Sequence, residues 1–376
     1  MPWNEVSAVS LRREFVMLAS AEGANVSALC RRFGISRKTG YKWLARSRHE
    51  AEPALTDRSR RPSHSPARTA PGVEALILEL RARHPAWGAR KLRAYLATQG
   101  HRALPAVSTI TEILRRHGQL DAARSTTQTP PQRFERPHPN ELWQMDFKGH
   151  FALETGRCHP LGVLDDHSRY NLCLKACPNE RRPTVQTALT DTFRHYGLPE
   201  GMLMDHGPPW GYDPEHPYTR LALWLLRLGI RVLHGRPRHP QTQGKEERFH
   251  RTLDVECLQG RRFRDLPHCQ RAFDAFRECY NLTRPHESLG MQPPIARYRP
   301  SPRSFPELLP PLEYADGDTL VRVDPNGQIR FQHRAIDVTR ALKGERVGVR
   351  PLTADGRFGV YYGAVKLREI DLREER

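Results

Sequence analysis

The chain has 376 residues and a formal net charge of +18 at pH 7, and an excess of basic residues on this scale indicates a polyanionic partner. A hydrophobic content of 38% excludes a largely disordered chain. The densest apolar run, residues 221–230, is far too short to span a bilayer, and seven scattered cysteines favour reduced thiols over a disulfide framework.

The basic excess is concentrated in the first third of the chain. Residues 1–136 hold 24 Lys and Arg against 11 Asp and Glu, whereas the remaining 240 residues hold 36 against 31. This asymmetry predicts that the first third binds phosphates and that the rest has another task. A merely soluble basic surface would explain the total charge better than its distribution. We expect no signal peptide, because charged residues precede any long apolar stretch.

Two stretches without apolar periodicity, both rich in proline and polar residues, are typical of linkers. They divide the chain into parts that we expect to fold separately. The expected order is a first part at 1–47, a linker at 48–71, a second part at 72–120, a linker at 121–140, a large block at 141–300 and a final segment at 312–376.

Residues 25–47 have the pattern of a helix, a tight turn and a second helix. Gly34 supplies the turn, and Ser36 is placed to cap the second helix. The basic residues of that helix are Arg37, Lys38 and Lys42. A basic second helix after a glycine turn is the helix-turn-helix layout, in which that helix enters the major groove of DNA. The alternative is an ordinary helical hairpin with a solvated basic face.

The second part has the pattern of three short helices, at 73–84, 88–100 and 108–118. The last is capped by Ser108 and ends with Arg115 and Arg116. Three short helices that end in a basic one favour a second DNA-binding module, of helix-turn-helix or winged-helix type. Two such modules in tandem suit a protein that reads an extended DNA site.

The pattern changes after residue 141. Strands are expected at 142–151, at 201–207, at 230–237, and as a pair within 158–176 that turns near 165–168; helices are expected at 184–197, 219–229 and 244–258. Strands followed by strands and then by helices predict a mixed sheet with helices on its faces.

Two acids stand at unusual places in this block. Asp146 lies inside a strand between large apolar neighbours, and Asp205 ends an apolar strand. Carboxylates are disfavoured in strand interiors, and a bound divalent cation is one reason to place them there. The structural alternatives are a turn or helix cap for Asp205 and a solubilising role on an edge strand for Asp146.

Three short motifs carry a resemblance to a known family. "WQMDF" (143–147), "MDHG" (204–207) and "HPQTQGKEERFHRTL" (239–253) resemble the three acidic motifs of the integrase-core superfamily, which holds retroviral-type integrases and many bacterial insertion-sequence transposases. Residues 280–298 resemble the segment that follows the core in bacterial members. The resemblance implies an α/β core of ribonuclease-H-like fold, with an Asp-Asp-Glu triad that binds Mg²⁺, for which Mn²⁺ can substitute.

Carried over residue by residue, the resemblance makes Asp146 the first metal ligand, Asp205 the second and Glu247 the third. These acids are 59 and 42 positions apart. The family pattern for the third motif is Gly-x-x-Glu, which counts from Gly244 to Glu247. All three acids are therefore expected to be catalytic.

The neighbouring Glu246 is distinguished from Glu247 by helix geometry. On a helical wheel Glu246 falls among apolar residues that should pack on the sheet, whereas Glu247 lies on a polar side. That polar side includes His250 and Arg251 and could meet DNA. The DNA contacts expected from this helix are Lys245, His250 and Arg251.

Other candidate ligands receive structural interpretations. Asp165 and Asp166 stand at a turn between two strands, where turn chemistry is a simpler explanation than metal ligation. Cys173 and Cys177, with His159 nearby in sequence, could suggest zinc. No second ligand pair follows at a suitable spacing, so buried thiols are the better interpretation.

The final segment alternates apolar and polar residues. Turn signals stand at 325–327 and at Asp355–Gly356. This pattern predicts a small antiparallel barrel. In the family that the core resembles, such a domain assists DNA binding or assembly.

Together these features predict a multidomain DNA transposase, with α-helical helix-turn-helix modules, an α/β ribonuclease-H-like core and an all-β C-terminal barrel. The modules should bind terminal inverted repeats, and the core should cleave and join DNA with Mg²⁺ by in-line displacement. The expected partners are double-stranded DNA and further copies of the chain, without membrane or small-molecule substrate, in the bacterial cytoplasm and associated with the nucleoid. The alternatives are a DNA-binding regulator with an inactive, domesticated core and a ribonuclease-H-type hydrolase.

Overall fold

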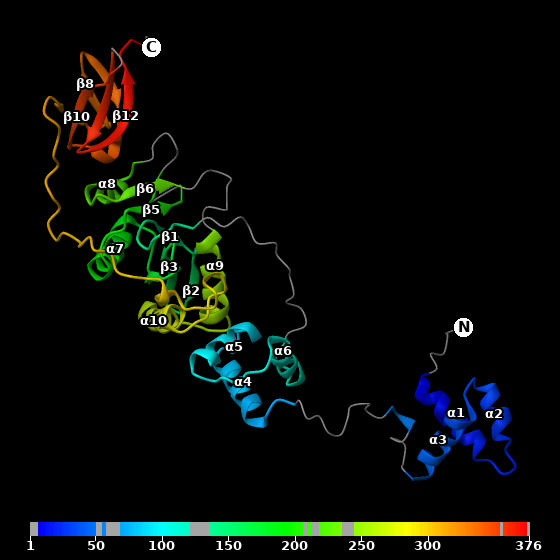
Figure 1. The fold of residues 1–376 in the computed structure, drawn as a ribbon. Coiled ribbons are helices and arrows are strands. Elements are labelled where there is room, and N and C mark those ends of the chain that lie inside the picture. The colour runs from blue at the N-terminus through cyan, green and yellow to red at the C-terminus, as the bar shows by residue number, and fades with distance from the viewer. Residues whose placement is uncertain are drawn as a thin grey trace. The chain divides into compact units, whose positions relative to one another are not determined.

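The computed structural model of the protein describes residues 7–49, 55–57, 68–120, 135–205, 209–211, 218–234, 244–353 and 356–373. The chain separates into two compact units, residues 1–68 and 69–376 (Figure 1). Most of the two expected linkers, and Asp355 of the expected final turn, lie outside the described residues.

The first unit is a cluster of three helices around a few apolar side chains. The helices are α1 (Ala8–Ala19), α2 (Val26–Arg32) and α3 (Arg37–His49). Phe15, Cys30 and Leu44 are buried at their centre. Helices α2 and α3 match the expected pair, and α1 is an additional helix that packs against both.

The turn between α2 and α3 has the features that the sequence predicts. Gly34 has a φ of +64°, a left-handed conformation that glycine adopts without steric cost. The Ser36 hydroxyl accepts a hydrogen bond from the backbone N–H of Thr39 at 3.1 Å, which caps α3. Gly40 lies so near α2 that a Cβ there would come within 2.6 Å of Cys30 Sγ. The expected helix-turn-helix geometry is therefore confirmed.

The second unit begins with another three-helix segment, made of α4 (Pro71–Arg83), α5 (Ala89–Thr98) and α6 (Val107–Arg116). No strand occurs between residues 68 and 120. The expected cap at Ser108 is wrong, because α6 begins one residue earlier and Ala106 precedes it without a side-chain hydrogen bond. This segment packs on the block that follows, where the Trp87 indole donates to Glu256 at 3.4 Å and Cys279 joins the helical core.

A six-stranded mixed sheet forms the centre of the second unit. Its strands are β1 (Trp143–Phe147), β2 (Phe151–Leu153), β3 (Gly156–Asp165), β4 (Asn171–Cys177), β5 (Gly201–Met204) and β6 (Arg231–His234). They follow the order β2-β3-β1-β5-β6, and β4 also pairs with β3. Strands β1, β5 and β6 are parallel, whereas β3 is antiparallel to its neighbours. The expected mixed sheet is confirmed.

Helices cover both faces of this sheet (Figure 1). One face packs against α7 (Arg182–Tyr196) and α8 (Arg220–Arg227) through residues such as Leu189 and Trp224. The other packs against α9 (Gly244–Leu253), the π-helical turn Asp254–Leu258 that continues it, and α10 (Leu266–Leu282). Strand β3 contributes apolar side chains to both cores, because successive strand residues point to opposite faces, whereas the apolar residues of β1 face α7 and α8 only.

The last segment is all-β. Its strands are β7 (Thr319–Arg322), β8 (Gln328–Phe331), β9 (Arg334–Asp337), β10 (Arg346–Pro351), β11 (Arg357–Tyr362) and β12 (Val365–Asp371). They form a four-stranded sheet, β12-β11-β10-β7, and a separate pair, β8-β9. A closed barrel is not confirmed, since the described strands do not form one continuous sheet. Within the described ranges, no helix combines the length and apolar character needed to cross a membrane.

Candidate catalytic site

The first two expected acids lie side by side because of the strand register. In the parallel pair of β1 and β5, Gln144 lies opposite Leu203. Asp146 and Asp205 each follow two residues later, so both stand at the carboxyl ends of neighbouring strands, which are about 4.8 Å apart in a sheet. This edge of a parallel pair is where open α/β sheets bind their ligands.

Helix α9 brings the two glutamates of the third motif to the same region. Glu246 is only 1% exposed and packs beneath Phe249 and Leu253 on the sheet, whereas Glu247 is exposed. Gly162, the partner of Asp146 in the β1–β3 ladder, makes room for Glu246, since a Cβ there would lie 3.2 Å from the Glu246 carboxylate. The structure therefore confirms the prediction from the helical wheel that Glu246 is buried and Glu247 is exposed.

The pKa of Asp146 is affected by the charges of the other two acids. Its side chain is 27% exposed. Burial raises the pKa of Asp146 to about 7, and the negative charges of Asp205, Glu180 and Glu247 add to this effect. The charges of Asp205 and Glu247 therefore disfavour the ionised form of Asp146, an effect that a bound cation would relieve.

Glu246 and His250 form an inner polar pair beside Asp146. His250 lies 3.7 Å from Glu246 through Nε2 and 4.0 Å from Asp146 through Nδ1. Neither Glu246 oxygen makes a hydrogen bond of good geometry with the described residues. Burial, helped by the charge of Asp146, raises the pKa of Glu246 well above the ordinary value, and the backbone of Leu164 offsets this only in part. Burial lowers the pKa of His250 to about 4, with Lys148 adding to the effect, so the imidazole is neutral at neutral pH.

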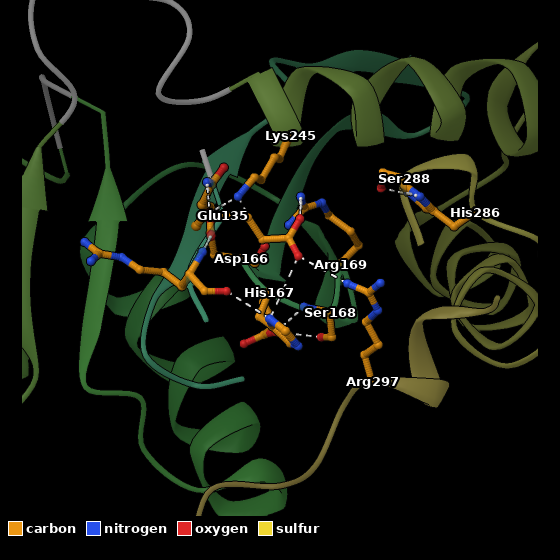
Figure 2. Close-up of polar contacts among 12 residues, drawn as sticks. Glu135, Asp166, His167, Ser168, Arg169, Lys245, His286, Ser288 and Arg297 are labelled. Carbon is orange, nitrogen blue, oxygen red and sulfur yellow. Dashed lines mark hydrogen bonds and ion pairs between the residues drawn. The ribbon is translucent and has the colours of Figure 1, made fainter. Parts of the chain in front are cut away.

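The rival acids Asp165 and Asp166 are fully buried and accept hydrogen bonds from protein donors. Asp165 accepts from the backbone of Asn140 at 2.7 Å and from both the backbone and the hydroxyl of Ser168. Asp166 accepts from Gln144 and from a lysine on α9 (Figure 2). Asp165 therefore has the turn role that the sequence predicts, whereas Asp166 is held by donors that are distant in sequence.

Among the candidates for zinc, His159 lies opposite Cys177 in the β3–β4 ladder, but no group of three ligands forms among the described residues. Cys173 and Cys177 are buried free thiols, and burial raises the pKa of each. His159 pairs with Glu180 at 2.9 Å. The buried-thiol interpretation agrees with this placement.

The expected DNA contacts differ in how they are placed. Arg37, Lys38 and Lys42 are exposed on α3. In the second helical segment, Arg115 pairs with Glu112 on its own helix, and Arg116 pairs with the buried Glu74 at 2.7 Å. These two arginines are thus partly engaged in holding their own segment together.

On α9, only one of the three expected DNA contacts faces outward. Arg251 is exposed. Lys245 pairs with Asp166, and burial, with Arg169 next, lowers its pKa to about 8. The side chain of His250 is 13% exposed and is turned toward the acids.

A basic cleft near the acids was not anticipated from the sequence. It has a volume of about 980 Å³ and lies between the starts of α7 and α8 and the residues that follow β9. Four arginines line it: Arg181, Arg182, Arg220 and Arg340. Glu180 also lines the cleft, and its charge is one of those that raise the pKa of Asp146. The adjacent Arg181 and Arg182 could have indicated a phosphate-binding surface from the sequence. Arg220 and Arg340 could not, because they are distant in sequence from that pair and from each other.

The donor chemistry of Asp146, Asp205 and Glu247 fits a hard divalent cation, because Mg²⁺ prefers carboxylate oxygens. In the part of the chain that the structure describes, no three His, Cys, Asp or Glu side chains converge closely enough to hold a metal ion. Asp205 is the last described residue before 206–208, and Gly244 is the first after 235–243.

Comparison with known domain families gives matches along most of the chain. Residues 136–240 and 228–294 each match an integrase core domain. Residues 12–63 match a helix-turn-helix domain, and residues 39–114 match a homeodomain-like domain. Residues 318–376 match the C-terminal domain of the IS481 family of transposases. The chain is thus similar to integrase core domains, to helix-turn-helix domains and to the C-terminal domain of a transposase family.

Two curated relatives are insertion-element proteins. The chain is 27% identical over 177 residues to the uncharacterized 31.7 kDa protein of insertion element IS407 from Burkholderia multivorans, covering 46% of this chain and 62% of the relative. It is 27% identical over 164 residues to the uncharacterized 39.2 kDa protein of insertion element IS476 from Xanthomonas euvesicatoria, covering 43% and 46%. The chain therefore spans less than two thirds of the length of either relative.

Solved structures that resemble the chain are distant. A chain of the simian T-cell lymphotropic virus intasome is 15% identical, with 79% of this chain and 100% of that chain covered and a TM-score of 0.38. The HTLV-2 integrase catalytic core domain in complex with magnesium is 14% identical, with 43% and 99% covered and a TM-score of 0.33. Because both TM-scores are below 0.5, the assignment of the core rests on the domain matches and the strand order.

Proposed function

We propose that the chain is a DNA transposase that binds the terminal inverted repeats of a mobile element and catalyses DNA cleavage and strand transfer. The observation that carries this proposal is the meeting of Asp146 and Asp205 at the carboxyl ends of β1 and β5, beside the helix that presents Glu247. The matches to integrase core domains and to an IS481 transposase domain support it.

Asp146, Asp205 and Glu247 are the residues that would hold Mg²⁺ or, in its place, Mn²⁺. When bound, the cation would supply positive charge and Lewis acidity at the reacting phosphate. The low exposure of Asp146 keeps that charge in a weakly screened setting, where electrostatic stabilisation is stronger than in water. The neutral His250 adds no competing positive charge beside the acids.

The reaction has two displacements at phosphorus. Water first attacks the phosphodiester at the element end, the bond from phosphorus to the bridging 3′ oxygen breaks, and that oxygen leaves as a 3′-hydroxyl. The 3′-hydroxyl then loses its proton and attacks a target phosphodiester, whose own 3′ oxygen departs and takes up a proton. No side chain is joined covalently to DNA at either stage, so no Ser, Tyr or Cys nucleophile is assigned.

DNA binding is assigned to the exposed basic residues. We propose that Arg37, Lys38 and Lys42 contact the element end, as the helix-turn-helix geometry of α2 and α3 supports. Arg251 stands one turn beyond Glu247 on the same exposed side. The arginines of the basic cleft would hold the backbone phosphates of the strand being cut, since guanidinium groups bind phosphate strongly. Lys245 and His250 face inward and are not included.

Joining two element ends to a target implies that several copies of the chain act together on double-stranded DNA. Arg115 and Arg116 would make weaker contacts, because both already pair with glutamates. The β-rich segment would support assembly or DNA binding, with or without closure into a barrel. A DNA-binding regulator with an inactive core is less well supported, because Asp146, Asp205 and Glu247 are all present in the sequence.

Strand transfer on a labelled duplex that carries the element's terminal repeat tests this proposal. With Mg²⁺ the wild-type protein is expected to yield joined product, and Asp146→Asn should lower the yield by roughly 10³-fold or more. Binding of the duplex, measured by fluorescence anisotropy, should be retained by the variant. A wild-type protein that binds the repeats but yields no product would instead favour the regulator.

A further inference from the structure

One buried carboxylate connects three separate parts of the second unit. Asp166 lies at the turn between β3 and β4 and is 0% exposed. Its Oδ2 accepts a hydrogen bond from the backbone N–H of Arg136 at 2.8 Å, and its Oδ1 accepts from the Gln144 amide at 2.7 Å. Oδ1 also pairs with Nζ of Lys245, and the Asp166 carbonyl accepts from the same ammonium at 3.2 Å. Figure 2 shows Lys245 reaching from α9 to this carboxylate.

Two of these donors stand next to the proposed metal ligands. Gln144 precedes Asp146 by two residues on β1, so the two side chains leave the strand on the same face. Lys245 precedes Glu247 by two residues in the first turn of α9. The carboxylate of Asp166 therefore links β1 and α9 at positions two residues before the acids that they carry.

The third donor belongs to the chain segment that leads into the core. Besides the contact of Arg136 with Asp166, the carbonyl of Arg136 lies 2.9 Å from Nδ1 of His167. Its neighbour Glu135 pairs with Arg169 at 2.9 Å and with Arg297 at 3.2 Å (Figure 2). The entry segment is thus held at the same turn as the two acid-bearing elements.

We propose that Asp166 is a positioning residue that sets the separation of Asp146 and Glu247 for metal binding. This inference rests on the proposed function. Both oxygens of Asp166 are occupied by protein donors and closed to solvent, so the residue acts through Gln144 and Lys245 and does not touch the cation. Partners that orient metal ligands in this way typically change metal affinity or activity by about 10- to 100-fold when removed. Lys245 accordingly serves the same arrangement and not DNA.

The test compares the dependence of strand transfer on Mg²⁺ concentration in Asp166→Asn, Lys245→Met and Lys245→Arg. Asp166→Asn and Lys245→Met should each raise the Mg²⁺ concentration for half-maximal activity by about 10- to 100-fold, with a smaller fall in the rate at saturation. Lys245→Arg should restore most of the affinity, because it keeps the charge-assisted bond. The double variant should be no worse than either single one, since both remove the same link.

Asp318→Asn is the matched control. Asp318 is also a buried acid, 2% exposed, and it pairs with Arg350 in the β-rich segment, away from the proposed site. It should lower stability without changing the Mg²⁺ requirement. A second readout without DNA is Mn²⁺ binding by isothermal titration calorimetry, in which Asp166→Asn should weaken binding by the same factor.

Two outcomes would overturn the inference. If Asp166→Asn and Lys245→Met lose stability as Asp318→Asn does but keep the wild-type Mg²⁺ and Mn²⁺ affinities, then Asp166 is only structural. If Asp166→Asn abolishes activity at every Mg²⁺ concentration, as Asp146→Asn should, then it is a ligand itself. If the wild-type protein neither forms product nor binds Mn²⁺, the proposed function and this inference are both wrong. That result differs from the two outcomes above, in which the wild-type protein is active.

Discussion

The core holds two groups of acids that are close in sequence but differ in environment. Asp146, Asp205 and Glu247 keep some contact with solvent at one edge of the sheet. Asp165, Asp166 and Glu246 are each at most 1% exposed. Carboxylates that are close in sequence therefore differ in what they can bind. The first group is accessible to a cation from solvent, whereas the second group contacts only protein.

The buried group itself is divided by hydrogen bonding. Asp165 and Asp166 each accept several hydrogen bonds from protein donors, although burial still raises the pKa of Asp165. Glu246 has only a weak contact with the backbone of Leu164 to offset its burial, and it lies beside Asp146 and a neutral His250. An uncompensated buried carboxyl costs stability, whereas a compensated one supports it. The comparison therefore predicts opposite effects for amide substitutions at the two kinds of buried acid.

The larger effect is expected at Asp165. Asp165→Asn replaces one oxygen by an amide donor and disturbs the bonds to Asn140 or Ser168, which should lower the free energy of unfolding by about 1–3 kcal/mol. Urea denaturation followed by tryptophan fluorescence measures the change. The folded fraction should keep its strand-transfer rate. If Asp165→Asn keeps the wild-type stability but loses activity, then Asp165 is a catalytic residue and the division into exposed catalytic acids and buried structural acids is wrong.

A smaller effect of opposite sign is expected at Glu246. Its pKa is raised in the folded protein, so ionisation favours the unfolded chain, and the cost appears as the pH rises above the ordinary carboxyl value of about 4.5. Glu246→Gln should therefore raise the free energy of unfolding at pH 8 by about 1 kcal/mol in the absence of metal. The gain should shrink as the pH falls toward 4.5. A pH-independent difference would show that Glu246 is not the uncompensated acid described above.

Much of the sheet could be predicted from the sequence because it depends on local periodicity, whereas the choice of Asp146, Asp205 and Glu247 comes from the resemblance to the integrase-core superfamily and stays a prediction. The alternation of β1 places Gln144 and Asp146 on one face, and the helical wheel separates Glu246 from Glu247. The strand pair joined at residues 165–168 also follows from turn residues that lie next to each other.

The links that hold the site could not be predicted, because they join residues that are distant in sequence. Lys245 meets Asp166 across 79 positions, and Arg116 meets Glu74 across 42. Both basic residues were expected to contact DNA on the basis of charge alone. A basic residue on a helix has the same local pattern whether it faces solvent or a buried acid, so only the tertiary structure separates the two cases.

The assignment of the third acid is the central claim, and a side-by-side strand-transfer assay of Glu247→Gln and Glu246→Gln tests it most directly. Both variants are measured with the terminal-repeat duplex at saturating Mg²⁺, together with duplex binding as a control for folding. Glu247→Gln should lose product by roughly 10³-fold or more, while Glu246→Gln stays within a few-fold of the wild type. Loss of product in Glu246→Gln with activity retained in Glu247→Gln would contradict the assignment and place the buried glutamate at the reacting phosphate.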